Sequence, residues 1–395
     1  MNEWRECRLG DLIEEIAMGP FGSNIKVECF VDKGVPVLNG SNLQGFKLNE
    51  STFNYVTPYK ADTLGRANAY RGDVVITHRG TLGQIVYIPD DSKYERYIIS
   101  QSQFRVKFKK DIDPQFMVYF FHSKYGKHLL LANASQVGVP AIARPSTSFK
   151  ELKATLPPLS EQKKIAAILS SLDEKIETNR KLNARLEELA QTLFKSWFID
   201  FEPFGGKMPE DWTIGKLSDI ADIIMGQSPK GNYINNNREG MIFYQGKAEF
   251  SERFPLIQNY TTEVTRIAPA NSILLSVRAP VGDVNITLND CCIGRGIASI
   301  NYRYGSNSFI YLLLKNKKDY FDIFDNGGTV FGCINKKALY EMPIILPSLS
   351  IIESFNQILF PIDDEIERRS NESARLAALR DTLLPKLMSG ELIPE

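Results

Sequence analysis

The 395-residue sequence has few of the residues that mark disulfide-bonded, metal-binding or membrane proteins. Its five cysteines form no C-x-x-C pair, and it has only three histidines. Neither a disulfide framework nor a zinc site is therefore indicated. No run of eighteen apolar residues occurs, and the first residues, MNEWRECRLGDLIEE, are charged from the start. The sequence thus predicts neither membrane insertion nor secretion, and a cytoplasmic protein is expected.

Net charge is also lacking, because 47 Lys and Arg residues balance 47 Asp and Glu residues. The overall charge therefore gives no argument for nucleic-acid binding, and any such case must rest on local features. Hydrophobic residues make up 43% of the chain, which is typical of globular proteins. The length exceeds what one core usually fills and indicates at least two domains.

Catalytic motifs are missing from the sequence as well. There is no phosphate-binding G-x-x-x-x-G-K-[ST] loop and no Asn/Asp-Pro-Pro-aromatic signature of amino-methyltransferases. The Gly294–Gly296 segment lacks the spacing of a dinucleotide loop, and residues 89–96, PDDSKYER, indicate a solvated turn more than a nuclease site. His78, His122 and His128 lack metal-ligand spacing. We therefore predict no catalytic residue, no bound metal and no cofactor on this chain.

The sequence contains an internal repeat. The segment EWRECRLGDLIEEIAMG near the start is echoed by DWTIGKLSDIADIIMG, so that Gly19 corresponds to Gly226. Further on, GDVVITHRGTLG matches NSILLSVRAPVG, which aligns Arg79 with Arg278. TLPPLS then matches IILPSLS, and from there the two copies stay aligned at a constant offset of 190 residues.

Each copy ends in a segment with apolar residues at alternating steps of four and three, a heptad pattern that predicts a long helix burying a narrow stripe. At about 33 residues, or about 50 Å, each helix is longer than one domain usually covers, so we expect the two to pair. The predicted seam consists of Ile165, Leu169, Leu172, Ile176, Asn179, Asn183, Leu186, Ala190, Leu193 and Trp197, paired with Phe355, Leu359, Ile362, Ile366, Arg369, Ser373, Leu376, Arg380, Leu383 and Leu387.

Both seams turn polar at the same central place, a feature that can fix register but leaves open whether the helices run parallel or antiparallel. Ser160 is a candidate N-cap of the first helix, and Ser350 with Glu353 forms a possible capping box for the second. Pro361 is expected to bend the second helix or to mark its start.

The remaining segments mix short β-type runs with one or two helical stretches each, and residues 113–132 and 307–324 are predicted to be helical. The predicted fold class is α+β. The predicted domains are residues 1–157, a helix over 158–202, a second domain over 203–347 and a helix over 348–395.

Two function classes compete on these observations. A stand-alone nuclease or methyltransferase conflicts with the missing motifs, whereas a coiled-coil scaffold with two adhesive domains is compatible with the helix periodicity.

The repeat resembles the specificity subunit (HsdS) of type I restriction-modification systems over the whole chain. LPPLSEQKKIAAILSSLDEKIE, LEELAQTLFKSWFIDFEPF, the repeated opening WRECRLGDLI and HRGTLG carry the resemblance. The second copy departs from the pattern at Ile351 and Ile352, where the first has Glu161 and Gln162.

The resemblance implies two target recognition domains separated by helices packed as an antiparallel coiled coil. Each domain would read one half of a split target in double-stranded DNA. It also implies two modification subunits docked on the helices, holding S-adenosylmethionine, and restriction subunits that use ATP and Mg²⁺.

Candidate DNA contacts are polar residues on Gly-bounded loops at matching places in both copies, since amides suit adenine edges and Arg or Lys suit guanine or phosphate. In the first copy they are Ser23, Asn24, Lys26, Asn39, Ser41, Asn42, Arg79, Gln101, Gln103 and Arg144. In the second they are Gln227, Ser228, Lys230, Gln245, Lys247, Arg278 and Arg295. Arg79 and Arg278 are the best-matched pair; the alternative is that they bond loop carbonyls.

Overall fold

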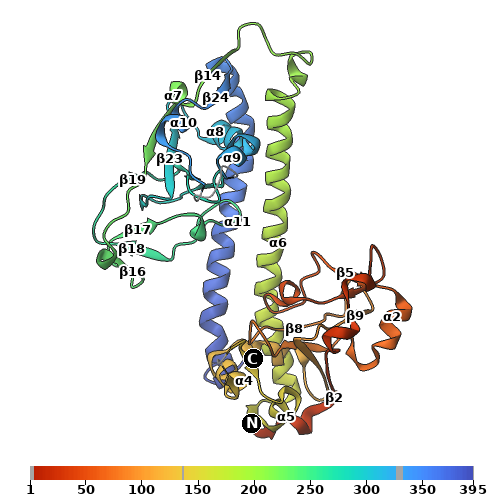
Figure 1. The fold of residues 1–395 in the computed structure, drawn as a ribbon. Helices are drawn as coiled ribbons and strands as arrows, with labels where there is room; N and C mark the ends of the chain where they lie inside the picture. Colours follow the sequence, from red (N-terminus) through yellow and green to blue (C-terminus); the bar gives the residue numbers. More distant parts are fainter. Residues whose placement is uncertain (1–3, 136–137, 326–331, 395) are drawn as a thin grey trace. The chain divides into compact units, whose positions relative to one another are not determined.

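The computed structural model describes residues 4–135, 138–325 and 332–394. Backbone contacts divide the chain into two compact units: unit 1 comprises residues 1–178 and 372–395, and unit 2 comprises residues 179–371. Two long helices, α6 (Leu159–Phe198) and α11 (Leu349–Ser389), contribute to both units (Figure 1). The units therefore divide within the helices, and the domain boundaries predicted at the helix ends remain a prediction.

Unit 1 contains a four-stranded and a five-stranded sheet. The first has the order β2 (Ile13–Met18), β10 (Gln103–Phe108), β7 (Val74–Thr77), β8 (Ile85–Tyr87). The second has the order β3 (Phe30–Val31), β5 (Asn54–Val56), β4 (Val35–Val37), β9 (Arg96–Ile98), β6 (Asn68–Tyr70). Two strand pairs join β1 (Arg5–Arg8) to β13 (Lys153–Leu156) and β11 (Ala134–Ser135) to β12 (Ala141–Ile142). Its short helices are α1 (Leu9–Leu12), α2 (Pro58–Thr63), α3 (Pro114–His122), α4 (Lys124–Leu131) and α5 (Pro145–Glu151).

Unit 2 repeats this topology. Its four-stranded sheet has the order β15 (Ala221–Met225), β23 (Ile297–Tyr302), β20 (Ile273–Ser276), β21 (Val284–Ile286). Its five-stranded sheet has the order β16 (Ile234–Asn235), β18 (Asn259–Thr261), β17 (Met241–Tyr244), β22 (Cys291–Ile293), β19 (Ile267–Ala268), and β14 (Thr213–Lys216) pairs with β24 (Pro343–Leu346). The helices are α7 (Leu217–Ile220), α8 (Ser308–Lys315), α9 (Lys318–Asp325) and α10 (Lys336–Tyr340). The α+β class and the internal repeat are thus confirmed.

The stretch predicted as one helix in each globule is two helices. In unit 1 the break falls at Ser123, whose extended backbone ends α3 and whose hydroxyl accepts from the N–H of Gly126 to cap α4. Gly126 allows the sharp turn, because a Cβ there would lie 2.0 Å from the carbonyl oxygen of Phe120. A local cap therefore overrides the continuous apolar pattern.

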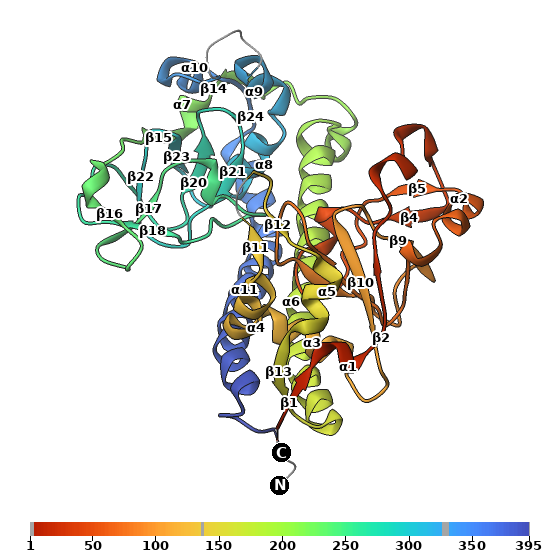
Figure 2. The same cartoon turned by 60° about the horizontal axis from the view of Figure 1, so that its bottom comes forward.

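The long helices pair antiparallel in each unit, as the resemblance implies (Figures 1 and 2). Residue numbers fall along α11 as they rise along α6. The contacts join Asp173 to Arg380, Lys175 to Glu372, Asn183 to Ser370 and Phe194 to Phe355.

All predicted seam residues are buried or half-buried. In the polar layer, Asn179 is fully buried and its amide oxygen accepts from the Arg369 guanidinium at 3.3 Å. Asn183 donates to the hydroxyl of Ser370 at 3.0 Å. These bonds pair part of the polar layer, while the amide oxygen of Asn183 and Nε of Arg369 are buried without a hydrogen-bond partner, so the layer costs some stability.

The expected helix starts are wrong. Backbone bonds from Gln162 to the carbonyl of Pro158 and from Ile352 to that of Ser348 already close the first turns, so Ser160 and Ser350 lie inside the helices. Helix α11 also runs through Pro361 without starting there. Pro361 is exposed, so water can reach the carbonyl that loses its donor.

Candidate nucleic-acid interface

Strand topology brings four loops of unit 2 to one place. β23 is antiparallel to both β15 and β20, so the ends of those strands flank the start of β23. β17 and β22 are parallel and end side by side. The loops that follow β15, β17, β20 and β22 therefore meet at one edge. We call it recognition edge 2, consisting of residues 226–228, 245–247, 277–279 and 294–296.

The same strand relations in unit 1 define recognition edge 1, consisting of residues 19–24, 38–42, 78–80 and 99–102. Matching backbone bonds tie the loops together in both units. Gly19 donates to Gln103 and Gly226 to Ile297, at 2.8 and 2.9 Å. His78 donates to Ser102 and Val277 to Gly296, also at 2.8 and 2.9 Å. The two edges thus share one backbone framework.

Gly226 is required by the closeness of these loops. A Cβ at Gly226 would lie 2.2 Å from the carbonyl oxygen of Gly294, and one at Gly19 would lie 1.8 Å from that of Ser100. We expect Gly226→Ala to reduce the free energy of unfolding by about 1–3 kcal/mol, because the backbone must shift. Urea unfolding measures this, with Gly231→Ala as the control, since a Cβ at Gly231 meets nothing within 4 Å. Equal stability of the two variants would contradict the close approach.

Arg79 and Arg278 occupy equivalent places two residues beyond β7 and β20. Each makes one isolated backbone bridge, to Ala141 and to Cys333, and each side chain is exposed. Within the described residues, no hydrogen bond or ion pair engages either guanidinium group. Both guanidinium groups are thus exposed, and the described part of the chain shows no bond from either to a loop carbonyl.

Other candidates at edge 1 are exposed: Asn24, Asn39, Ser41 and Gln101. The amide oxygen of Asn39 accepts from the backbone N–H of Ser41 at 2.8 Å, which leaves its NH₂ group facing outward as a donor. Arg144 is exposed in a left-handed conformation before α5, on the segment whose Ile142 donates to the carbonyl of His78. Ser23 lies in a turn at this edge, and its side chain is outside the described part of the chain.

Edge 2 brings together Gln227, Ser228, Gln245 and Arg295. The hydroxyl of Ser228 lies 3.0 Å from the amide nitrogen of Gln245 and accepts from the backbone N–H of Arg295 at 3.1 Å. The side chains of Gln227 and Arg295 are exposed. This small network holds the Arg295 backbone, so its side chain projects from a fixed point.

Five candidates are placed less favourably. Asn42 and Gln103 are fully buried, and the side chain of Asn42 donates to the carbonyls of Asn49 and Thr52, so neither side chain is accessible from outside. Lys247 is ion-paired to Asp283 at 2.5 Å. Lys230 is exposed, with its backbone N–H bound to Glu263, and the equally exposed Lys26 follows edge 1.

His78 adds no charge to edge 1 at neutral pH. Burial lowers the pKa of His78 and Arg79 lowers it further, while a contact with the carbonyl of Gln101 acts in the opposite direction. The positive charge of edge 1 therefore comes from Arg79.

The long helices present two different rows on either side of the seam. One row, at heptad position e, packs against the globule of its own unit: Ala166, Asp173 and Leu384 in unit 1, Glu187, Phe194, Asn356 and Asp363 in unit 2. The opposite row, at position g, includes Lys175 and Glu372, which pair across the seam at 3.5 Å. In an antiparallel pair equal positions adjoin, so within each unit the e row lies on one side of the seam and the g row on the other.

The g row carries exposed apolar side chains. Ile168 and Leu379 are 37% and 47% exposed in unit 1, and Leu189 and Ile358 are 47% and 42% exposed in unit 2. Ile168 corresponds to Ile358 and Leu189 to Leu379 at the 190-residue offset. A repeated apolar row turned away from the globules is typical of a docking surface.

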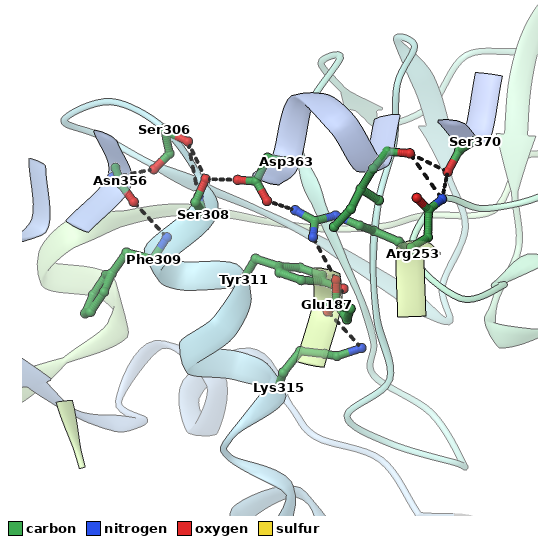
Figure 3. A network of polar contacts seen from close by, with 12 residues as sticks. Glu187, Arg253, Ser306, Ser308, Phe309, Tyr311, Lys315, Asn356, Asp363 and Ser370 are labelled. Carbon is green, nitrogen blue, oxygen red and sulfur yellow. Dashed lines mark hydrogen bonds and ion pairs between the residues drawn. The ribbon is translucent and has the colours of Figure 1, made fainter. Parts of the chain in front are cut away.

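The e row of unit 2 anchors a buried arginine (Figure 3). Arg253 is 6% exposed, pairs with Glu187 at 2.7 Å and with Asp363, and lies 4.5 Å from the ring centre of Tyr311. Ser308 on α8 also donates to Asp363. In unit 1 the corresponding Asp173 accepts from Tyr119 at 2.6 Å and pairs with Arg380 at 2.7 Å. Carboxylates of the e row thus fasten helix to globule, Asp173 in unit 1 and Glu187 with Asp363 in unit 2.

Two kinds of feature are missing from the described ranges. No helix there is long and apolar enough to cross a membrane, and no group of three or more His, Cys, Asp or Glu side chains is arranged to hold a metal ion.

Comparison with known proteins decides the family. The family model for the type I restriction modification DNA specificity domain matches residues 1–188 and again 209–376. The chain belongs to this family of specificity subunits.

Relatives of this specificity subunit align with it over nearly their whole lengths. A Methanocaldococcus jannaschii protein described as the MjaX specificity subunit of a type I restriction enzyme is 30% identical, with 99% of this chain and 94% of that protein covered. The HindI specificity subunit of Haemophilus influenzae is 26% identical, with 99% and 100% covered. The crystal structure of the type I S subunit from M. genitalium shares the fold (TM-score 0.62, 17% identity, 99% and 96% covered).

Sequence reasoning missed some features of this specificity subunit. Asp173 and Asp363 are related by the 190-residue offset, so the repeat could have marked them as a matched pair. Phe21, between two glycine-bounded turns of edge 1, is 80% exposed. Phe21 was not among the predicted DNA contacts because those were restricted to polar residues.

Proposed function

We propose that this specificity subunit reads a bipartite target in double-stranded DNA, with one recognition edge for each half-site. The single observation that carries the proposal is that both units build the same four-loop edge and furnish it with different side chains. Edge 1 presents Arg79 and Gln101, and edge 2 presents Gln227, Arg278 and Arg295. Different donors and acceptors on one framework select different bases, so the two half-sites differ.

The subunit itself catalyses nothing in this proposal. DNA modification and cleavage belong to partner subunits, which hold S-adenosylmethionine, ATP and Mg²⁺. Since this chain carries no net charge, we expect it to bind DNA weakly by itself and to gain affinity in the complex, because neutralised phosphates supply much of the binding free energy.

Two modification subunits dock on the g rows, one in each unit, and restriction subunits complete the complex. The support is the apolar row, repeated at symmetric positions and left uncovered by the globules. Two equivalent patches fit two copies of one partner. The long helices, shared by both units, then act as a ruler that sets an unread gap between half-sites.

We expect Ile168→Asp with Leu379→Asp to remove one modification subunit from the complex, and Leu189→Asp with Ile358→Asp to remove the other. Docking would remove the introduced carboxylate from water without giving it a partner, which weakens binding. Mass measurement of the co-purified complex counts the subunits. Ala167→Asp, on the neighbouring exposed position of α6, is the control and should leave the complex intact. A full complex in both double variants would place docking elsewhere.

Base-resolved adenine methylation in cells tests the whole proposal. Cells expressing this chain with its modification subunit should show two half-sites around a fixed gap, absent with the modification subunit alone. We expect Arg79→Ala to weaken or relax one half-site and Arg278→Ala the other, by about 1–3 kcal/mol of binding free energy each. Lys110→Ala, beyond the opposite end of β10, is the control. An intact complex that methylates no motif would instead favour a scaffold.

A further inference from the structure

Edge 1 contains an apolar side chain that folding does not use. Phe21 is 80% exposed, although the loop around it is held in place. Gly19 is bonded to Gln103, Asn24 donates its backbone N–H to the carbonyl of Phe21 at 2.8 Å, and a Cβ at Gly22 would lie 2.3 Å from the amide oxygen of Gln101. A loop held by its backbone therefore presents an exposed aromatic ring one residue before Gly22, which adjoins Gln101, a candidate DNA contact.

Edge 2 has no counterpart to this ring. The corresponding loop, Gly226–Lys230, contains no aromatic residue, and its Ser228 is bonded to Gln245 and Arg295. The shared framework thus carries an apolar group in unit 1 and a polar network in unit 2. An exposed ring common to both units would point to a general role, whereas a ring on one edge points to sequence preference.

We propose that Phe21 contacts the C5-methyl group of a thymine in the half-site read by unit 1. On the base edges of the major groove, that methyl is the apolar group, and phenylalanine is among the residues that contact it. The proposal rests on the DNA-reading function above and adds one base preference to it. It predicts an A·T pair at the contacted position of that half-site.

The test uses the specificity subunit assembled with its modification subunit and duplexes carrying the mapped motif. Each thymine of the half-site that depends on Arg79 is replaced in turn by deoxyuridine, which lacks only the methyl group. We expect one replacement to weaken binding by the wild-type complex about fourfold, the effect of one buried methyl group. Phe21→Ala should bind the unaltered duplex at least fourfold more weakly and should be insensitive to that replacement.

Tyr59→Ala is the matched control. Tyr59 is 79% exposed and lies on α2, which follows β5. Because β5 is antiparallel to β4, the end of β5 pairs with the start of β4. Edge 1 lies at the other end of β4, so Tyr59 is away from it. It should leave both affinities unchanged. Thermal unfolding of both variants checks the fold, which loses no buried contact in either.

Equal sensitivity of wild type and Phe21→Ala to every uracil, or no sensitivity in either, would overturn the methyl contact. Fluorescence of a 2-aminopurine that rises with the wild-type complex, without a uracil effect, would assign Phe21 to base unstacking and also overturn it. Failure of the wild-type complex to prefer its motif would refute the proposed function and this inference together. Motif preference without a uracil effect refutes only the inference.

Discussion

Asp363→Asn is expected to lower the free energy of unfolding of unit 2 by about 2–4 kcal/mol, because it leaves Arg253 buried with one carboxylate where it had two. Burial acts to lower the pKa of Arg253, but Asp363, Tyr311 and Glu187 raise it by more. These neighbours thus offset the cost of burying the guanidinium charge. Asp363 accepts from Arg253 with one oxygen and from Ser308 on α8 with the other, and the substituted amide keeps only one acceptor oxygen for these two donors.

Arg253→Met distinguishes two explanations for the loss of stability: lost attraction within the network and an uncompensated buried charge. It removes the charge and keeps most of the volume, so we expect a smaller loss than for Asp363→Asn. Hydrogen exchange or urea unfolding of the full chain measures both. Glu252→Gln, which alters the exposed 3.5 Å pair with Arg180, is the control and should cost less than about 1 kcal/mol. A larger loss for Arg253→Met would mean that attraction within the network, and not an uncompensated charge, dominates.

Lengthening both long helices by one heptad is expected to widen the gap of the DNA target and leave its half-sites unchanged. Duplicating residues 172–178 in α6 and 372–378 in α11 keeps the a/d register of both. Seven residues add about 10.5 Å of helix, which corresponds to at most about three base pairs of duplex. The original motif should then lose its methylation.

Methylation mapping again supplies the measurement. A heptad inserted in α6 alone is the control, because the two seams then differ in length and the complex should lose activity. New bases in either half-site, or an unchanged gap in the doubly lengthened protein, would show that the helices do not set the spacing.

The repeat and the long helices were within reach of sequence reasoning because their signals are periodic. Heptads extend over both helices, and every seam residue from Ile165 to Leu387 is buried or half-buried. The helix ends were not predicted, since Ser160 and Ser350 offer caps that the backbone does not use. Nor was the break at Ser123, because an apolar pattern does not register one capping hydroxyl.

The recognition edges show where local pattern stops being informative. Polar residues between glycines marked the loops around Asn39, Arg79, Gln227 and Arg295, yet the same rule selected the buried Asn42 and Gln103. The sequence does not distinguish a polar loop side chain that bonds carbonyls from one that faces water. Which of the two occurs depends on the strands beside it.

The sequence by itself determined the duplicated α+β plan, the heptad seam and the family, because repeats and periodicity are properties of residue order. Tertiary structure alone decided that four loops per unit meet at one edge, since strand direction sets which ends adjoin. It also decided that the e row fastens the globules while Ile168, Leu189, Ile358 and Leu379 of the g row stay partly exposed, because exposure depends on what packs against each row.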